Sequence, residues 1–229
     1  MLVHQRLRRA HAASGVVELL DSFAHQGPNG LHQCLVFELL GPTVDSVVTE
    51  YYRSYGEEDA DRLEDTTVLR ITRQLLQALA AMHKAGYAHG GLSLAIHTNF
   101  SNDYIILTVD LLLSDVSGQN LVFTANRLGN MSVDAIFEVI GEPKTENLVR
   151  CDGQALTPGI PEQLVNATEW DSWIDEDDED VRLIDFGEAF THDAIPTELA
   201  EPSGLQVPEK IFTGKFDYRV DLWRAGCLV

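Results

Sequence analysis

The feature that most constrains the fold of this chain is a hydrophobic run that leads directly into Asp-Phe-Gly, at residues 183–187. The run begins at Val181, and its aliphatic residues predict a short β-strand that ends at the aspartate. Taken alone, such a tripeptide is a weak signal, because short motifs recur by chance. Its weight comes from other signals that precede and follow it in a definite order.

These signals lie on both sides of the Asp-Phe-Gly. They are His89-Gly90, Asp115 and Asn120 before it, and Val207-Pro208-Glu209 and the DxWxxG residues Asp221, Trp223 and Gly226 after it. The asparagine follows the aspartate Asp115 by five residues. The order resembles that of protein kinases, in which a His-x-Asp loop with an asparagine five residues later precedes Asp-Phe-Gly and Ala-Pro-Glu.

Several longer phrases narrow the resemblance to the SR-protein kinase group and its fungal relatives. They are VVELLDSF, HQGPNG, LVFELLG, LIDFGEAF and DYRVDLW. The resemblance covers about 200 of the 229 residues, so it does not rest on one motif. It implies an α+β, protein-kinase-like two-lobe fold that is incomplete at both ends, and serine/threonine kinase activity connected with the regulation of mRNA splicing.

Local patterns predict the elements of such a fold. Residues 16–23 and 31–38 are β-rich runs separated by a turn-forming Gly-Pro-Asn-Gly, which predicts two antiparallel strands. Residues 66–87 predict an amphipathic helix that stops near Gly86. The apolar residues at helical spacing in it are Leu69, Leu75, Leu76, Leu79 and Met82. Shorter helices are expected at 132–140 and at 218–229.

The resemblance also suggests how the chain is divided. Residues 1–41 are interpreted as a remnant of the small lobe and the hinge, and residues 42–229 as a partial large lobe. Residues 131–180, which end in an acidic run, match the spacer that these kinases carry between the catalytic loop and Asp-Phe-Gly. We expect much of this spacer to be loop.

One departure from the family lies inside the catalytic loop. Residues 91–114 separate His89-Gly90 from Asp115, and removing these 24 residues restores the continuous phrase HGDVSGQNLVF. An insert of whole codons keeps the reading frame. The segment begins at a glycine and ends in an aliphatic stretch, as a translated pyrimidine-rich tract of an intron would. Our hypothesis is a retained intron or gene-model error that forms a poorly packed excursion at the mouth of the cleft. The alternative is a genuine insertion, which would divide the active-site loop.

The resemblance implies a role for each candidate site residue. Asp115 would orient the substrate hydroxyl, and Asn120 and Asp185 would hold the Mg²⁺ ions that bridge the phosphates of ATP. Phe37 would stand at the back of the adenine pocket, and the backbone from Glu38 to Leu40 would bond the base. Without the family, Phe37 is interpreted as an ordinary core aromatic residue.

Three further residues have structural roles in the family. Asp221 would accept hydrogen bonds from the backbone of the catalytic loop and so position it. His89 is likewise structural. Glu209 would pair with an arginine of a later helix.

Other departures from the family concern groups that hold ATP. No Gly-rich loop and no strand lysine stand ahead of Val16, and Ser117 occupies the place of a lysine that contacts the transferred phosphate. We therefore expect a negligible rate of phosphate transfer, and uncovered apolar helix faces around Leu75, Leu79 and Trp223. The alternatives are a non-catalytic pseudokinase fragment that binds basic proteins, and a non-functional gene-model product.

The excess of acidic over basic residues indicates which kinds of binding partner the chain favours. Sixteen basic and 36 acidic residues give a formal net charge of −20, which argues against nucleic acid or an anionic membrane as the main partner. Basic Ser/Arg-rich protein substrates are favoured, although acidity that only maintains solubility is an equal alternative.

Three distant cysteines and the absence of a secretory signal indicate a reducing compartment, cytoplasmic or nuclear. The most apolar run, 104–113, is too short to cross a bilayer.

Overall fold

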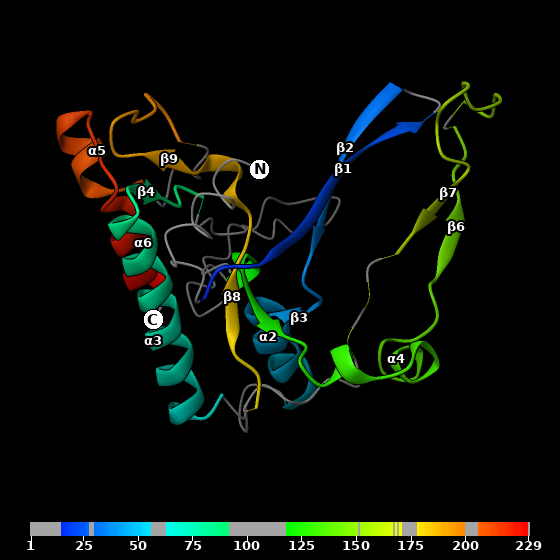
Figure 1. Ribbon diagram of the computed structural model, residues 1–229, viewed down its shortest axis with the longest axis horizontal. Helices are drawn as coiled ribbons and strands as arrows, with labels where there is room; N and C mark the ends of the chain where they lie inside the picture. Colours follow the sequence, from blue (N-terminus) through cyan, green and yellow to red (C-terminus); the bar gives the residue numbers. More distant parts are fainter. Residues whose placement is uncertain are drawn as a thin grey trace, which may run out of the picture.

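The computed structural model describes residues 15–27, 30–55, 63–91, 118–150, 152–166, 168, 170, 178–199 and 206–228. In chain order the helices and strands are β1 (Leu19–Gly27), β2 (Gly30–Phe37), β3 (Leu40–Thr43), α2 (Val44–Tyr55), α3 (Asp65–Lys84), β4 (Tyr87–Ala88), β5 (Leu121–Thr124), α4 (Val133–Ile140), β6 (Thr145–Asn147), β7 (Gln163–Val165), β8 (Val181–Leu183), β9 (Phe190–Thr191), α5 (Pro208–Thr213) and α6 (Val220–Leu228). Short 3-10 turns occupy Gly118–Asn120, Leu128–Asn130 and Phe186–Glu188. Figure 1 shows α3, α5 and α6 together on one side of the molecule and the β1–β2 pair projecting away from them.

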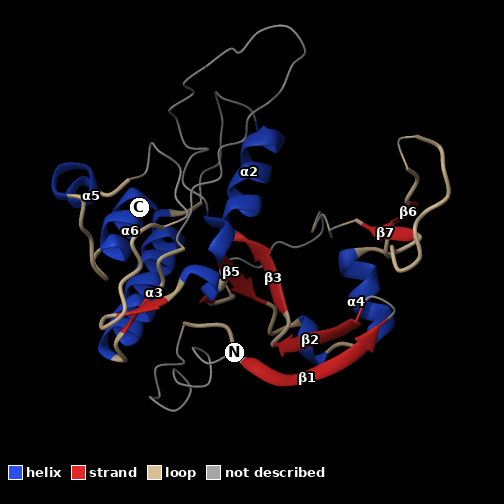
Figure 2. Cartoon of the chain, turned by 90° about the horizontal axis from the view of Figure 1, so that it is seen from above, coloured by secondary structure: helices blue, strands red, loops and turns tan. Residues whose placement is uncertain are grey.

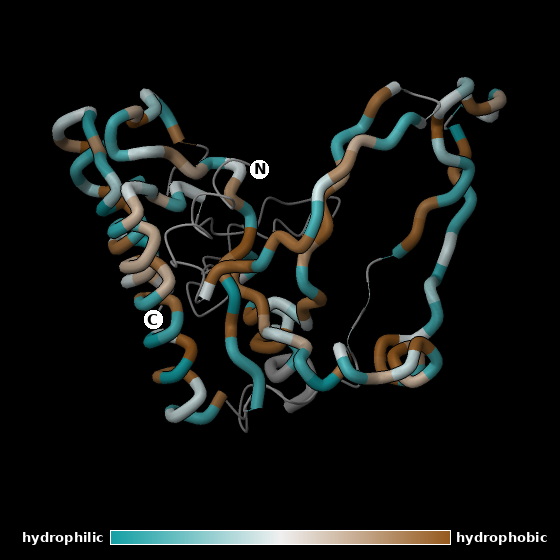
Figure 3. The backbone as a smooth tube through the Cα atoms, viewed as in Figure 1, coloured by the Kyte–Doolittle hydropathy of each residue, from teal (hydrophilic) through white to brown (hydrophobic). Residues whose placement is uncertain are grey.

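The predicted antiparallel strand pair is confirmed. β1 pairs with β2 from Leu19 opposite Phe37 to Gly27 opposite Gly30, with an irregularity near Leu19. Figure 3 shows hydrophobic stretches along both strands. Large apolar side chains of the pair remain 38–71% exposed, namely Leu20, Phe23, Leu31, Leu35, Val36 and Phe37. The pair therefore contributes little to the core among the described residues.

The long amphipathic helix is also confirmed, as α3. Its buried face carries Ile71, Leu75, Ala78, Leu79 and Met82, which recur at the spacing of one helical stripe. Gly86 follows the helix with φ +85°, a conformation that favours glycine, so the stop signal was correctly predicted. Two leucines of the predicted apolar set lie instead on the exposed side, with Leu69 68% and Leu76 46% exposed.

A three-stranded sheet in the order β3-β5-β8 packs against α3 and forms the core with it. All neighbouring strands are antiparallel, and Val16 adds an isolated parallel bridge to Leu183. Figure 2 shows β3 and β5 beside α2, with α3 at a distance from the β1–β2 pair. The buried residues of this core are Val16, Ile71, Leu75, Ala78, Leu79, Met82, Tyr87, Leu121, Phe123, Val181, Leu183 and Ala225.

The expectation of uncovered helix faces was wrong for α3. Leu75 is 1% exposed and Leu79 is fully buried, because the central sheet and α6 cover this face. On α6 the expectation is confirmed, since Trp223 is 45% and the adjacent Leu222 48% exposed. The buried face of α6 carries Val220 and Ala225 together with polar residues.

The spacer at 131–180 contains more regular structure than expected. The predicted helix is present as α4, whose first turn is capped because the Ser132 hydroxyl accepts a hydrogen bond from the Ala135 amide at 3.3 Å. The antiparallel pair β6–β7 was not anticipated. Of residues 91–114, only Gly91 is among the described residues, so the expected excursion lies outside them. No helix of the described ranges is long and apolar enough to span a bilayer.

Candidate active site

The two candidate metal-binding residues emerge from the same end of the β5–β8 ladder. β5 begins directly after Asn120, and β8 ends two residues before Asp185. Leu121 lies opposite Leu183, and the Ile184 amide donates to the Asn120 carbonyl at 2.9 Å. The ladder therefore brings together two side chains that lie 65 residues apart in the chain.

Each of these side chains is oriented by a hydrogen bond to backbone. Asn120 donates from Nδ2 to the Gly91 carbonyl at 2.6 Å, so its carboxamide oxygen is the atom that a cation would bind. Asp185 adopts left-handed backbone angles, φ 60° and ψ 75°, and its Oδ1 accepts a hydrogen bond from the Gly187 amide at 3.2 Å. The carboxylate remains exposed to solvent.

The loop that starts at His89 is held by a buried carboxylate on α6. Asp221 is fully buried and accepts hydrogen bonds from the His89 amide at 2.8 Å and the Gly90 amide at 2.9 Å. The Arg224 guanidinium donates to the Gly90 carbonyl at 2.7 Å. The role that the resemblance implied for Asp221 is therefore present in the geometry.

Position 90 requires a glycine because of its backbone conformation and a close neighbouring carbonyl oxygen. Its φ is +68°, and a Cβ atom built on it would lie 2.5 Å from the Glu188 carbonyl oxygen. Any side chain at this position would force the loop away from the segment that follows Asp-Phe-Gly.

One contact of Asp221 was missed by sequence reasoning. The Nε2 atom of His83, in the last turn of α3, lies 2.8 Å from Oδ2 of Asp221. The His83 ring also packs edge-on against Tyr218, with centroids 4.9 Å apart. Arg224 was missed as well, although its position three residues after Asp221 places both on one helical face.

His89 is a neutral structural residue in this fold. Burial lowers the pKa of His89 below its ordinary value, and the nearby Asp221 carboxylate only partly offsets that effect. Nε2–H donates to the Ile184 carbonyl at 2.8 Å, and Nδ1 accepts from the Gly91 amide at 3.2 Å. Its ring stands edge-on to Phe186, with centroids 5.1 Å apart. The imidazole thus links the loop that starts at His89 to the Asp-Phe-Gly segment.

This burial predicts a loss of stability in mild acid. Because the pKa of His89 is lower in the folded protein than its ordinary value of 6.5, the unfolded chain binds more protons than the folded protein as the pH falls below 6.5. We expect the free energy of unfolding to fall as pH decreases from 7 to 5.5, by up to about 1.4 kcal/mol per pH unit. Chemical denaturation at stepped pH measures this slope. A His89→Phe variant should show a shallower slope, and an unchanged slope would contradict the assignment to His89.

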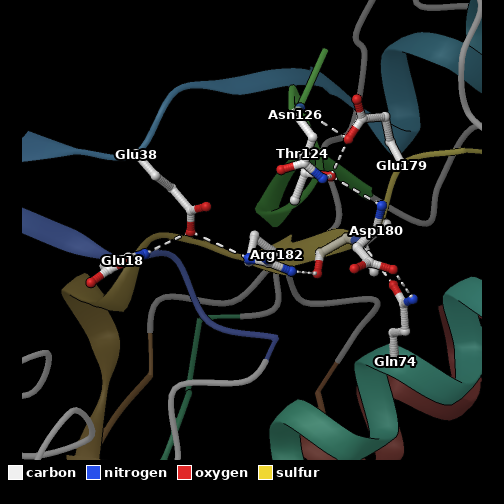
Figure 4. Close-up of polar contacts among 9 residues, drawn as sticks. Glu18, Glu38, Gln74, Thr124, Asn126, Glu179, Asp180 and Arg182 are labelled. Carbon is white, nitrogen blue, oxygen red and sulfur yellow. Dashed lines mark hydrogen bonds and ion pairs between the residues drawn. The ribbon is translucent and has the colours of Figure 1, made fainter. Parts of the chain in front are cut away.

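The hinge candidates lie at the junction between the β1–β2 pair and the central sheet. Phe37 is the last residue of β2 and is 38% exposed, and Leu40 begins β3 opposite Thr124. Glu38 lies between them, and its carboxylate accepts hydrogen bonds from the Glu18 amide at 2.8 Å and from Nε of Arg182 at 3.3 Å (Figure 4). Arg182, on β8, was not singled out from the sequence.

Asp115 lies outside the described residues. Of the predicted site, the structure thus places Asn120 and Asp185 together at one end of β5 and β8, and the hinge residues at the connection into β3. The ion pair between Glu38 and Arg182 joins the hinge candidates to β8, the strand that leads into Asp-Phe-Gly.

Comparison of this fold with solved structures identifies its class. A crystal structure of a kinase domain superposes with a TM-score of 0.54 and 17% sequence identity, covering 99% of this chain and 50% of that chain. The chain therefore has a protein kinase fold, represented in part. No protein-family model matches the sequence.

Sequence relatives then specify the group of kinases. The protein kinase dsk1 of Schizosaccharomyces pombe is 35% identical over 95 residues, which are 42% of this chain and 15% of dsk1. The serine/threonine-protein kinase SRPK of Physarum polycephalum is 24% identical over 216 residues, which are 93% of this chain and 44% of that protein. SKY1 of Saccharomyces cerevisiae is 30% identical over 106 residues, 46% of this chain and 12% of SKY1.

These relatives are SR-protein kinases, so the resemblance found in the motifs is confirmed. The chain spans less than half the length of each of these three relatives.

Proposed function

We propose that this chain derives from a serine/threonine protein kinase that transfers the γ-phosphate of ATP to basic, Ser/Arg-rich proteins. The observation that carries the proposal is the convergence of Asn120 and Asp185 at one end of the β5–β8 ladder. Phosphoryl transfer asks a protein mainly to position its reactants and to neutralise charge. A pair of oxygen ligands beside an ordered loop suits that task.

The residues present fit Mg²⁺. The carboxamide oxygen of Asn120 and the carboxylate of Asp185 are hard oxygen donors, which Mg²⁺ prefers. Within the described part of the chain no group of three or more His, Cys, Asp or Glu side chains is arranged to hold a metal. Phosphate oxygens and water would therefore complete the coordination, as is usual for Mg²⁺ bound together with a nucleotide.

The remaining residues would bind the adenine, orient the substrate hydroxyl and hold the loop backbone in place. Bound Mg²⁺–ATP supplies the phosphate and the charge that offsets its oxygens. Asp115 would accept the hydrogen bond of the substrate hydroxyl, and the Glu38 carbonyl and Leu40 amide would bond the adenine. Asp221 holds the backbone of the loop from which Asp115 would act.

Substrate and compartment are proposed from charge and composition. The net charge of −20 favours basic substrates through long-range attraction. A cytoplasmic or nuclear location agrees with the cysteine pattern. In the same way we interpret 1–41 as small-lobe and hinge remnant, and 42–229 as partial large lobe with the spacer at 131–180.

One observation favours a second function. The 24 residues between Gly90 and Asp115 interrupt the loop that should carry the substrate-orienting aspartate. A chain with such a loop could hold a basic protein on its acidic surface without transferring phosphate.

The metal site is tested by nucleotide binding. We expect Asp185→Ala and Asn120→Ala each to weaken Mg²⁺-dependent binding of a non-hydrolysable ATP analogue by at least about tenfold, because each removes one oxygen ligand. Isothermal titration with and without Mg²⁺ measures this. Asp178→Ala, at an exposed aspartate near the start of β8, is the matched control. Equal Mg²⁺ dependence in all variants would disprove the assigned ligands.

A further inference from the structure

One buried acidic residue has no part in the proposed chemistry. Glu179 belongs to the acidic run that ends the spacer, where a charge run is normally solvated. It is nevertheless only 2% exposed. The chain leaves the central sheet at Thr124 and returns at Glu179, 55 residues later. We call the segment between Thr124 and Glu179 the excursion, and the place where its two ends meet the neck. Glu179 therefore lies at the neck.

The carboxylate of Glu179 binds the outgoing limb of that excursion. Its Oε2 accepts hydrogen bonds from the Thr124 hydroxyl and from the Asn126 amide, the latter at 3.1 Å. Its Oε1 accepts one from the Arg127 amide at 3.3 Å. Figure 4 shows the side chain turned toward the end of β5. Both carboxylate oxygens are thus bonded to residues that start the excursion.

The neighbouring backbone ties the returning limb to the same place and to α3. The Thr124 amide donates to the Asp180 carbonyl at 2.7 Å, and the Asp180 amide donates to the Thr124 hydroxyl oxygen at 3.0 Å. Gln74 on α3 donates to the Asp180 carboxylate at 2.6 Å and accepts from the Val181 amide at 2.8 Å. The Arg70 guanidinium donates to the Glu179 carbonyl.

The ladder that this neck closes is short. β5 and β8 pair only through Leu121–Leu183, Val122–Arg182 and Phe123–Val181. The entropic cost of joining two strands grows with the length of the connection, so a long excursion favours opening more than a tight hairpin does. A buried carboxylate that is fully hydrogen-bonded opposes that opening, whereas an unbonded one would promote it.

We propose that Glu179 is a positioning residue that clamps the neck of the excursion and thereby holds the β5–β8 ladder closed. The candidate Mg²⁺ ligands Asn120 and Asp185 lie at the opposite end of this ladder, so the clamp acts on them through the strands. The effect of the clamp on a metal site at Asn120 and Asp185 rests on the proposed function. The closure of the β5–β8 ladder by Glu179 does not.

Hydrogen exchange tests the closure. The Thr124 amide, bonded to Asp180, reports the neck, and the Ile184 amide, bonded to Asn120, reports the metal end. We expect Glu179→Gln to speed exchange of both at least about tenfold and to leave the Ala85 amide at the end of α3 unchanged. Glu142→Gln, at an exposed glutamate within the excursion, is the matched control and should change neither amide.

Shortening the excursion provides the rescue. Replacing residues 132–176 by a short Gly/Ser linker keeps Arg70, Thr124, Asn126 and Arg127, the described residues that bond Glu179, and lowers the closure cost. In that background Glu179→Gln should return both amides toward the exchange rates of the parent chain. Acceleration at Thr124 alone would overturn the positioning role, and equal acceleration at Ala85 would show a general loss of stability. If Glu179→Gln does not fold, Thr124→Val removes one donor, and Thr124→Ser restores it.

Nucleotide binding separates the clamp from the proposed function. Glu179→Gln should reduce the Mg²⁺-dependent part of ATP-analogue affinity and spare the Mg²⁺-independent part, with recovery in the shortened chain. Absence of Mg²⁺-dependent binding in the parent chain would overturn the metal site together with this consequence. The exchange rates would still decide whether Glu179 closes the ladder.

Discussion

Deletion of residues 91–114 is expected to raise phosphate transfer to an Arg-Ser peptide at least about a hundredfold above that of the 229-residue chain, whose own rate we expect to be negligible. The deletion joins Gly90 directly to Asp115. Misplacement of a catalytic group by even a small distance costs orders of magnitude in rate, and the 24 intervening residues separate Asp115 in sequence from the anchored His89-Gly90.

The structure indicates where Asp115 would then stand. In the present chain Gly91 follows Gly90, donates its amide to His89 and accepts a hydrogen bond from Asn120. After the deletion Asp115 would occupy the position of Gly91 and could make the same backbone bonds. A Cβ atom there would lie 3.3 Å from the Glu188 Cβ and 3.6 Å from the Asp185 carbonyl oxygen. A small shift of Glu188 would accommodate it beside the candidate metal site.

Radiolabel transfer to the peptide would compare three proteins: the full chain, the deletion variant, and the deletion variant carrying Asp115→Asn. The substitution should abolish the gained activity, because an amide cannot orient the substrate hydroxyl in the same way. Robust labelling by the unmodified chain that Asp185→Ala abolishes would contradict our view of residues 91–114. It would instead support a genuine insertion in a working kinase.

Replacement of Asp221 by alanine is expected to lower the free energy of unfolding by about 3–5 kcal/mol. The buried carboxylate accepts hydrogen bonds from the amides of His89 and Gly90 and lies against His83. Its removal leaves these buried donors without an acceptor, which costs more than the loss of an average hydrogen bond. A typical domain has a net stability of about 5–15 kcal/mol, so this variant should melt far below the parent.

Two variants test the origin of that effect in thermal and denaturant melts. Asp221→Asn retains one carbonyl acceptor and should fall between the parent and Asp221→Ala. Asp193→Ala removes an exposed carboxylate from the turn after β9 and should change stability by less than about 0.5 kcal/mol. Equal effects at Asp193 and Asp221 would mean that net charge, and not the buried contacts, governs stability.

Local sequence patterns predicted the β1–β2 pair, α3, α4 and β8, because each depends on residues close together in the chain. Alternation of β-formers and turn residues defined the strand pair, and a helical stripe ending at glycine defined α3. The patterns did not separate Leu75 and Leu79, which are buried, from Leu69 and Leu76, which are exposed. Which side of a broad apolar stripe is covered depends on the sheet and on α6, whose positions no local pattern contains.

The order of the motifs was sufficient to single out Asn120 and Asp185, and the resemblance supplied a role for Asp221. The contacts that hold these residues came only from the fold. His83 bonds Asp221 across 138 positions, Glu38 bonds Arg182 across 144, and Glu179 bonds Thr124 across 55. A histidine or glutamate in a polar stretch carries no signal of such a partner, because the interaction exists only after distant segments have packed.

The amino-acid order alone therefore indicated the kinase class, the β1–β2 pair, α3, α4 and β8, and the candidate metal ligands, since short motifs and local periodicity carry these signals. Tertiary packing decided which apolar faces are buried, how the loop at His89 is held, and why Glu179 is buried in an otherwise solvated acidic run. The physical reason is the same in each case. Burial and hydrogen bonding depend on groups that are remote in sequence, and the free energy of a carboxylate in water or in a core is set by those groups.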